Sequence, residues 1–169
     1  MSSQKVFSVG DKVVYPMHGA GIIEAIEQKE VLDRVEKYYI MRMPIGDLRV
    51  MIPMSSCDEL GLREVIDEEG VRQVFEVLKA ETTSMSQNWN RRYRANMEKI
   101  KTGDIFEVAE VVRNLSARDR EKGLSTGERK MLENARQILI SELVLAQDTT
   151  EEHVEQQLRE LLGENDSET

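Results

Sequence analysis

The residues that most often carry catalytic or metal chemistry are scarce in this chain of 169 residues, which has one cysteine and two histidines. The lone Cys57 excludes an internal disulfide, and His18 and His153 are too far apart in sequence for a local metal-binding motif. We therefore expect an intracellular protein with no metal and no cofactor.

Long hydrophobic runs are also missing. No stretch approaches the roughly 18 uninterrupted apolar residues that a membrane-spanning helix needs. The N-terminal letters MSSQKVFSVGDK lack the apolar region of a signal peptide. These absences predict a soluble, cytoplasmic protein that makes no contact with a membrane.

A catalytic site is not visible in the sequence. General acid–base or nucleophilic catalysis needs titratable groups brought together, and no nucleophile–base pair can be recognised. His18 lies in PMHGAG, where the glycines indicate a turn. A predicted strand follows this turn, whereas a phosphate-binding loop leads into a helix. We predict that the protein is not an enzyme.

Positive charge is in short supply, with 23 Lys and Arg against 32 Asp and Glu and a net charge of −9. Residues 1–70 carry −5, residues 71–147 carry +3 and residues 148–169 carry −7. An acidic protein that confines its positive charge to one segment can approach a polyanion there, while the rest of its surface repels non-specific contacts. The middle segment is therefore the candidate binding region.

The first part of the chain is predicted to be β. Short runs rich in Val, Ile and Tyr, separated by turn residues, occupy 11–16, 20–31, 36–43 and 48–54. Residues 62–66 are a candidate fifth strand that closes the set. We predict a small antiparallel, SH3-like β-barrel in a domain of residues 1–66.

After Gly70 the apolar period becomes helical. Asn88 is a plausible N-cap for a helix that begins at Trp89, and Ser125 with Glu128 forms a capping box for a long helix. Thr149 with Glu152 repeats the box for a last helix. We predict an α+β protein whose second domain, residues 67–163, is a bundle of about five helices, followed by a frayed acidic tail at residues 164–169.

The segment NWNRRYRANMEKIK, residues 88–101, contains the only tryptophan. Two interpretations fit it. Trp89 could be the first apolar residue of an ordinary amphipathic helix with a solvated basic face. Alternatively, a half-exposed ring beside cations and a helix N-terminus suits a wedge in a DNA duplex with phosphate anchoring. The cations are Arg91, Arg92, Arg94, Lys99 and Lys101, opposed only by Glu98.

Four stretches together resemble the CarD/CdnL family of bacterial transcription regulators: FSVGDKVVYPMHGAG, YYIMRMPIGDLRVMIP, NWNRRYRANMEKIKTGD and LSTGERKMLENARQIL. The resemblance covers about residues 7–146. It implies a Tudor-like N-terminal barrel that docks on the β subunit of RNA polymerase, a module shared with the transcription-repair coupling factor. It also implies a helical domain that contacts promoter DNA at the upstream edge of the open bubble.

The resemblance also implies roles for individual residues. Trp89 would wedge into the minor groove and hinder collapse of the bubble. The backbone contacts would come from Arg91, Arg92, Arg94, Arg129 and Lys130. On the barrel, the polymerase-binding positions correspond to Lys29 and Met51; Met51 has lost the positive charge, for which Arg49, two residues earlier, is a candidate substitute.

We therefore expect a monomeric, polymerase-bound factor that stabilises the open promoter complex. Two other functions remain open from the residues alone. One is an architectural DNA-binding protein that acts without polymerase, and the other is a protein–protein adaptor whose Trp face grips another protein. The target promoters, the sign of regulation and the orientation of the two domains are not fixed by the sequence.

Overall fold

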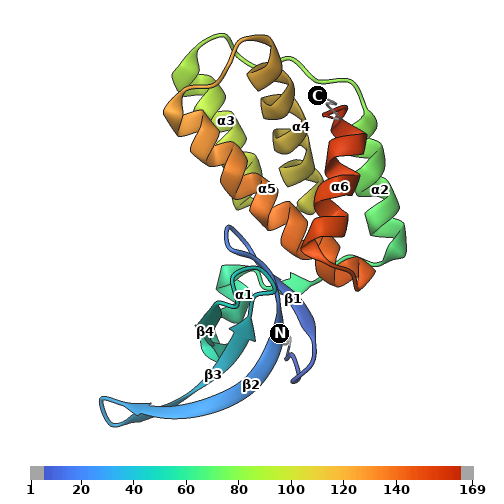
Figure 1. The fold of residues 1–169 in the computed structure, drawn as a ribbon. Coiled ribbons are helices and arrows are strands. Elements are labelled where there is room, and N and C mark those ends of the chain that lie inside the picture. Colours follow the sequence, from blue (N-terminus) through green and yellow to red (C-terminus); the bar gives the residue numbers. More distant parts are fainter. Residues whose placement is uncertain (1–5, 165–169) are drawn as a thin grey trace.

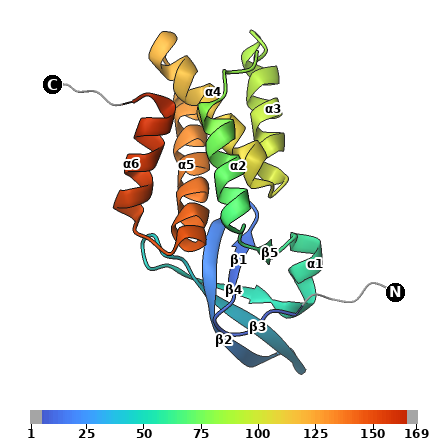
Figure 2. The same ribbon diagram turned by 90° about the vertical axis from the view of Figure 1, so that its right-hand side faces the viewer.

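The computed structural model describes residues 6–164, with a β-sheet at one end and a bundle of helices at the other (Figures 1 and 2). The strands are β1 (Lys12–Tyr15), β2 (Gly19–Val31), β3 (Arg34–Arg42), β4 (Arg49–Pro53) and β5 (Arg63–Glu64). The α-helices are α1 (Cys57–Leu60), α2 (Glu68–Lys79), α3 (Trp89–Lys101), α4 (Ile105–Glu121), α5 (Thr126–Gln147) and α6 (Glu151–Leu162). A 3-10 turn, Met54–Ser56, precedes α1.

The five strands form one antiparallel sheet in the order β4-β3-β2-β1-β5. The long β2–β3 hairpin projects away from the helices (Figure 1). Its two turn residues, Leu32 and Asp33, have φ values of 49° and 64°. Turns with two positive φ values match the twist of the flanking strands, which explains the tight two-residue connection.

The predicted closed barrel is wrong for the described residues. The expected fifth strand, β5, pairs with β1 through Val13 and Val14, and so lies at the edge opposite β4. The 3-10 turn and α1 carry the chain from β4 to that far edge. β5 is two residues long and leads on to the bundle, and β4 and β5 are the two edges of an open sheet.

The described residues contain six α-helices. The four-residue α1 was not predicted, and the five longer helices follow β5. Asn88 and Ser125 are N-caps as expected, whereas α6 is capped by Thr150 rather than by Thr149. None of these helices is long and apolar enough to cross a membrane.

Separate cores hold the sheet and the bundle. The sheet packs around residues such as Ile23, Tyr39 and Ile52, and the bundle packs around α5. A small third cluster joins them, because Val14 and Ala20 of the sheet contact Leu145 of α5. The C-terminal end of α5 is thus the junction between sheet and bundle.

The predicted acidic tail, residues 164–169, lies almost entirely outside the described residues. Glu164 is the exception. Its N–H donates to the carbonyl oxygen of Arg159 at 2.8 Å, and its carboxylate is 3.4 Å from Arg136. At this first position the chain is therefore held against the bundle.

Candidate nucleic-acid interface

The N-terminal ends of α3 and α5 meet at the end of the bundle far from the sheet (Figure 1). Asn88 caps α3, because its Oδ1 accepts a hydrogen bond from the backbone N–H of Arg91 at 3.0 Å. Ser125 caps α5, because its Oγ accepts from the N–H of Glu128 at 3.2 Å. Both caps satisfy N–H groups that a helix start leaves unpaired, so the two ends are well defined.

Trp89 is the first residue of α3 and is 42% exposed. Its Nε1 donates a hydrogen bond of 2.9 Å to the Oγ of Ser125. One face of its indole stacks on Tyr93, with ring centroids 5.0 Å apart and planes at 21°. Gly127 lies beside both rings, where an added Cβ would be 3.5 Å from Trp89. The ring is therefore held in one orientation but is not covered.

Arg92 turns inward, away from solvent. Its Nε is 2.6 Å from a carboxylate oxygen of Glu128, and the two side chains are 4% and 2% exposed. Its Nη1 also donates to the carbonyl oxygens of Ser86 and Gln87, at 3.1 and 3.3 Å. These contacts use the guanidinium to join the loop before α3 to α5. The expected phosphate contact of Arg92 is thus not available in this structure.

The Arg92–Glu128 pair shifts both titrations. The hydrogen bond from Arg92 is the main cause that lowers the pKa of Glu128; burial opposes it, and Ser125 adds a smaller lowering. The same bond raises the pKa of Arg92. Both groups are therefore charged near neutral pH, and each neutralises the other.

The other cations of the predicted DNA surface are exposed. Among residues 6–164, Arg91, Arg94 and Lys130 have no carboxylate within ion-pair distance. Arg129 is 3.5 Å from Asp119 and donates to the carbonyl oxygen of Leu124 at 3.4 Å, so it is partly engaged. Because Arg92 is paired with Glu128, the unpaired positive charge on α3 is smaller than the sequence predicts.

Lys99 accounts for the rest of that difference, because it pairs with Glu110 of α4. With Arg92 also paired, two of the five cations counted in the sequence are neutralised inside the fold. Among the described residues, Arg91, Arg94 and Lys101 remain exposed and without an ion pair, and Lys101 is at the far, C-terminal end of α3. The basic surface is therefore narrow and lies next to Trp89.

The three predicted polymerase-binding residues lie on β2 and β4, the two strands that flank β3 in the sheet. The Nζ of Lys29 on β2 is 3.8 Å from the sulfur of Met51 on β4, and Met51 is 43% exposed. Arg49 shares that face but pairs with Glu24, at 2.7 Å from its Nε. Lys29 and Met51 thus form one exposed patch, whereas the charge of Arg49 is already compensated.

Sequence reasoning missed two features of this end of the bundle. It identified Ser125 and Glu128 only as a capping box, whereas Ser125 also holds the indole and Glu128 also holds Arg92. It treated Arg92 as equivalent to its neighbours. A local motif carries no record of these partners, because each lies 36 residues away in the chain.

Comparison with known proteins places these residues in two family domains. Residues 7–66 match the model described as the CarD-like/TRCF RID domain, and residues 73–159 match the model of the CarD C-terminal domain. The chain belongs to the CarD family. This CarD-family protein is also 44% identical over 149 residues to "Putative transcription factor YdeB" of Bacillus subtilis (strain 168), an alignment covering 88% of this chain and 97% of the relative.

The two matched regions divide the candidate residues of this CarD-family chain. The N-terminal region contains Lys29, Arg49 and Met51. The C-terminal region contains Trp89, the buried Arg92–Glu128 pair and the capped start of α5. Each candidate site therefore lies within one family domain.

Proposed function

We propose that this protein is a transcription regulator that docks on the β subunit of RNA polymerase through residues 1–66. Residues 67–163 then contact promoter DNA at the upstream edge of the melted region, where Trp89 wedges into the minor groove. The protein acts as a monomer and needs no cofactor. Its effect is to prolong the lifetime of the open complex.

The orientation of Trp89 is the observation that carries this proposal. An apolar wedge must be exposed before binding, and a ring that is already fixed loses little conformational freedom when it binds. Trp89 meets both conditions, because it is 42% exposed and is held by Ser125 and Tyr93. A ring buried in the bundle or free to rotate would serve the role less well.

The cations around Trp89 supply modest phosphate anchoring. Four remain after Arg92 is excluded: Arg91, Arg94, Arg129 and Lys130. If each contacts one phosphate, log K should fall with log salt concentration with a slope of about −3.6. DNA binding alone is then weak at physiological salt, and attachment to polymerase supplies the effective concentration that makes it productive.

The wedge favours the open promoter because the two DNA states impose different costs. Unstacking a base step in closed duplex costs roughly a few kcal/mol. Polymerase has already disrupted that step at the edge of the bubble. The protein therefore binds the open state more tightly, and only such a difference in affinity can shift the equilibrium.

The decisive experiment compares the parent with Trp89→Ala in open-complex half-life and in binding to polymerase. We expect Trp89→Ala to bind polymerase as the parent does and to lose the extension of half-life. An unchanged extension would remove the wedge from the mechanism. Met97→Ala, on the same helix but partly buried against the bundle core, is the matched control for loss of apolar volume.

Two further measurements separate this function from its rivals. A plain architectural protein should shift naked duplex in a gel without polymerase, whereas the proposed factor should not. A protein–protein adaptor held by the Trp face should keep its complex at high salt, whereas phosphate contacts should weaken steeply. A gel shift without polymerase would favour the architectural protein, and a complex that survives high salt would favour the adaptor.

A further inference from the structure

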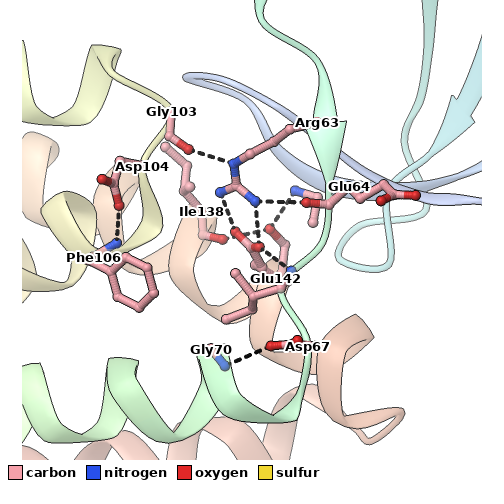
Figure 3. A network of polar contacts seen from close by, with 12 residues as sticks. Arg63, Glu64, Asp67, Gly70, Gly103, Asp104, Phe106, Ile138 and Glu142 are labelled. Atoms are coloured by element: carbon pink, nitrogen blue, oxygen red, sulfur yellow. Dashed lines mark hydrogen bonds and ion pairs between the residues drawn. The ribbon is translucent and has the colours of Figure 1, made fainter. Parts of the chain in front are cut away.

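Arg63 and Glu142 form a bidentate ion pair at the junction of sheet and bundle (Figure 3). Both nitrogen–oxygen distances are 2.8 Å, and the side chain of Glu142 is 1% exposed. Glu142 also accepts the backbone N–H of Ile66 at 2.9 Å. A paired charge with this geometry fixes direction as well as distance.

Arg63 connects three parts of the fold. It belongs to β5, its Nη atoms reach Glu142 on α5, and its Nε donates to the carbonyl oxygen of Gly103 at 2.9 Å in the turn between α3 and α4 (Figure 3). The chain that links sheet to bundle, residues 65–67, passes the same carboxylate through Ile66. Hydrogen bonds to Glu142 thus hold the chain both just before the link, at Arg63, and within it, at Ile66.

Other contacts from β1 and β2 reach the same turns of α5. The N–H of Ala20 donates to the Oγ of Ser141 at 2.9 Å, and the Nζ of Lys12 donates to the carbonyl oxygen of Leu145 at 2.9 Å. Gly19 approaches so closely that an added Cβ would be 2.7 Å from the Ser141 hydroxyl. Three residues near the C-terminal end of α5 are therefore held by three strands: Ser141 by β2, Glu142 by β5 and Leu145 by β1.

The opposite end of α5 holds the wedge. Ser125, its N-cap, accepts the hydrogen bond of Trp89, and Glu128 pairs with Arg92 beneath it. At about 1.5 Å rise per residue, Ser125 and Glu142 are about 25 Å apart along the helix. A single helix thus joins the sheet that carries Lys29 and Met51 to the indole.

We propose that Arg63 and Glu142 are positioning residues that fix the bundle to the sheet. Because α5 connects the two, docking of the sheet on polymerase then sets the orientation of Trp89. This inference rests on the function proposed above. The clamp contributes to neither binding surface. It decides what fraction of docked molecules present the ring to the edge of the bubble, and a smaller competent fraction weakens the effect in proportion.

The test is the paired replacement Arg63→Met with Glu142→Leu in the full-length chain. Replacing both partners of a buried ion pair with apolar side chains of similar volume often preserves stability, whereas removing one partner leaves a buried charge. Circular dichroism and urea unfolding check the fold. The matched control is Lys79→Met with Glu76→Leu, an exposed pair in the last turn of α2, at the end of that helix away from the junction.

The first readout is the spread of orientations. Spin labels at Lys37→Cys on the sheet and Glu81→Cys after α2, with the buried Cys57 changed to Ser, report the distance between the two parts. We expect a narrow distance distribution in the parent and in the control pair, and a broad one in the Arg63/Glu142 variant. A narrow distribution in that variant would show that the clamp does not set the orientation.

The second readout is function, measured without labels. We expect the Arg63/Glu142 variant to bind polymerase as the parent does but to extend open-complex half-life about 5- to 10-fold less, as a competent fraction near a tenth implies. A broad distribution with an unchanged half-life would overturn the inference. Trp89→Ala, measured in parallel, distinguishes failure of the proposed function from failure of this inference. If the wedge mechanism is wrong, Trp89→Ala keeps the parent's half-life extension, whatever the Arg63/Glu142 variant does.

Glu142→Gln keeps the proposal testable if the paired variant does not fold. The amide retains an oxygen that can accept from Ile66 and Arg63 but removes the charge. We expect its distance distribution and its half-life extension to fall between those of the parent and of a fully released junction. Parent-like values for both in a folded Glu142→Gln protein would count against the ion pair as the positioning element.

Discussion

Arg92 and Glu128, from different helices, form a buried ion pair whose Nε–O distance is 2.6 Å, directly beside the exposed Trp89. The same glutamate lies in the capping turn of α5, where Ser125 holds the indole. The exposed indole of Trp89 thus lies beside buried polar side chains that are paired with one another. Arg92 and Glu128 therefore support the surface from inside, whereas Trp89 is exposed for contact with a ligand, and the two roles predict different effects of mutation.

Replacement of Arg92 should act on stability. Arg92→Met leaves the carboxylate of Glu128 buried without its partner, which typically costs about 3–5 kcal/mol of unfolding free energy. Arg91→Met, at the exposed neighbouring position, should change the stability by less than about 0.5 kcal/mol. Urea unfolding followed by circular dichroism measures both. Equal effects of the two replacements would contradict the inward role of Arg92.

Acid should weaken the fold partly through Glu128. Its folded pKa is lowered by Arg92, so its stabilising contribution is complete above the unfolded value of about 4.3 and is lost as the pH falls through the folded pKa. Parent and Glu128→Gln should therefore differ most in unfolding free energy near neutral pH and converge in acid. A difference that stays constant from pH 7 to pH 3 would show that the pairing does not shift this titration.

Removal of the Ser125 hydroxyl should affect both the helix and the ring. Ser125→Ala loses an N-cap, at a cost of about 1 kcal/mol, and also the hydrogen bond from Trp89. Thr150→Ala, which removes the cap of α6, should lose similar stability. We expect only Ser125→Ala to shorten open-complex half-life at a temperature where both variants are folded. Matching half-lives would mean that the bond to the indole is unimportant.

The exposed cations should govern the salt dependence of DNA binding. Arg91→Ala and Arg94→Ala should each reduce the salt slope of DNA binding by about 1, measured with a fork-shaped promoter fragment bound by polymerase. Lys37→Ala, a cation on the sheet, is the control and should leave the slope unchanged. If neither arginine altered the slope, the phosphate anchors would have to lie elsewhere.

Polymerase binding should respond to charge at the patch formed by Lys29 and Met51. Lys29→Glu should weaken binding to the β subunit at least tenfold in a pull-down or calorimetric titration, without change in the unfolding curve, because it replaces the positive charge of the proposed docking patch by a negative one and so reverses its electrostatic complementarity. Arg49→Ala should have a smaller effect, since Glu24 already compensates Arg49. Unchanged affinity of Lys29→Glu would place the docking surface on another part of the sheet.

The sequence predicted the elements that local chemistry fixes. The helix that begins at Trp89 follows from the Asn88 cap, and the start of α5 follows from Ser125 and Glu128, since both signals act within one turn. The exposure of Trp89 was also foreseeable, because a large ring at a helix start beside a polar loop is hard to bury.

Pairings between distant segments were not predictable from one sequence. Nothing local distinguishes Arg92 from Arg91 or Arg94, because the difference is a carboxylate 36 residues away. The strand at residues 63–64 was expected to close a barrel, but strand composition does not say which edge a strand joins. The ion pair of Arg63 with Glu142 was not predicted for the same reason, because the two residues are 79 positions apart in the chain.

The position of the only indole of the chain makes it a natural optical probe. All tryptophan emission of the protein comes from Trp89, which is packed against Tyr93 and half open to water. Insertion between bases would replace water on its open side by stacked π-systems and quench that emission. Engagement with the promoter can therefore be followed in real time on the unmodified chain, provided that the partner's own tryptophans are replaced or subtracted.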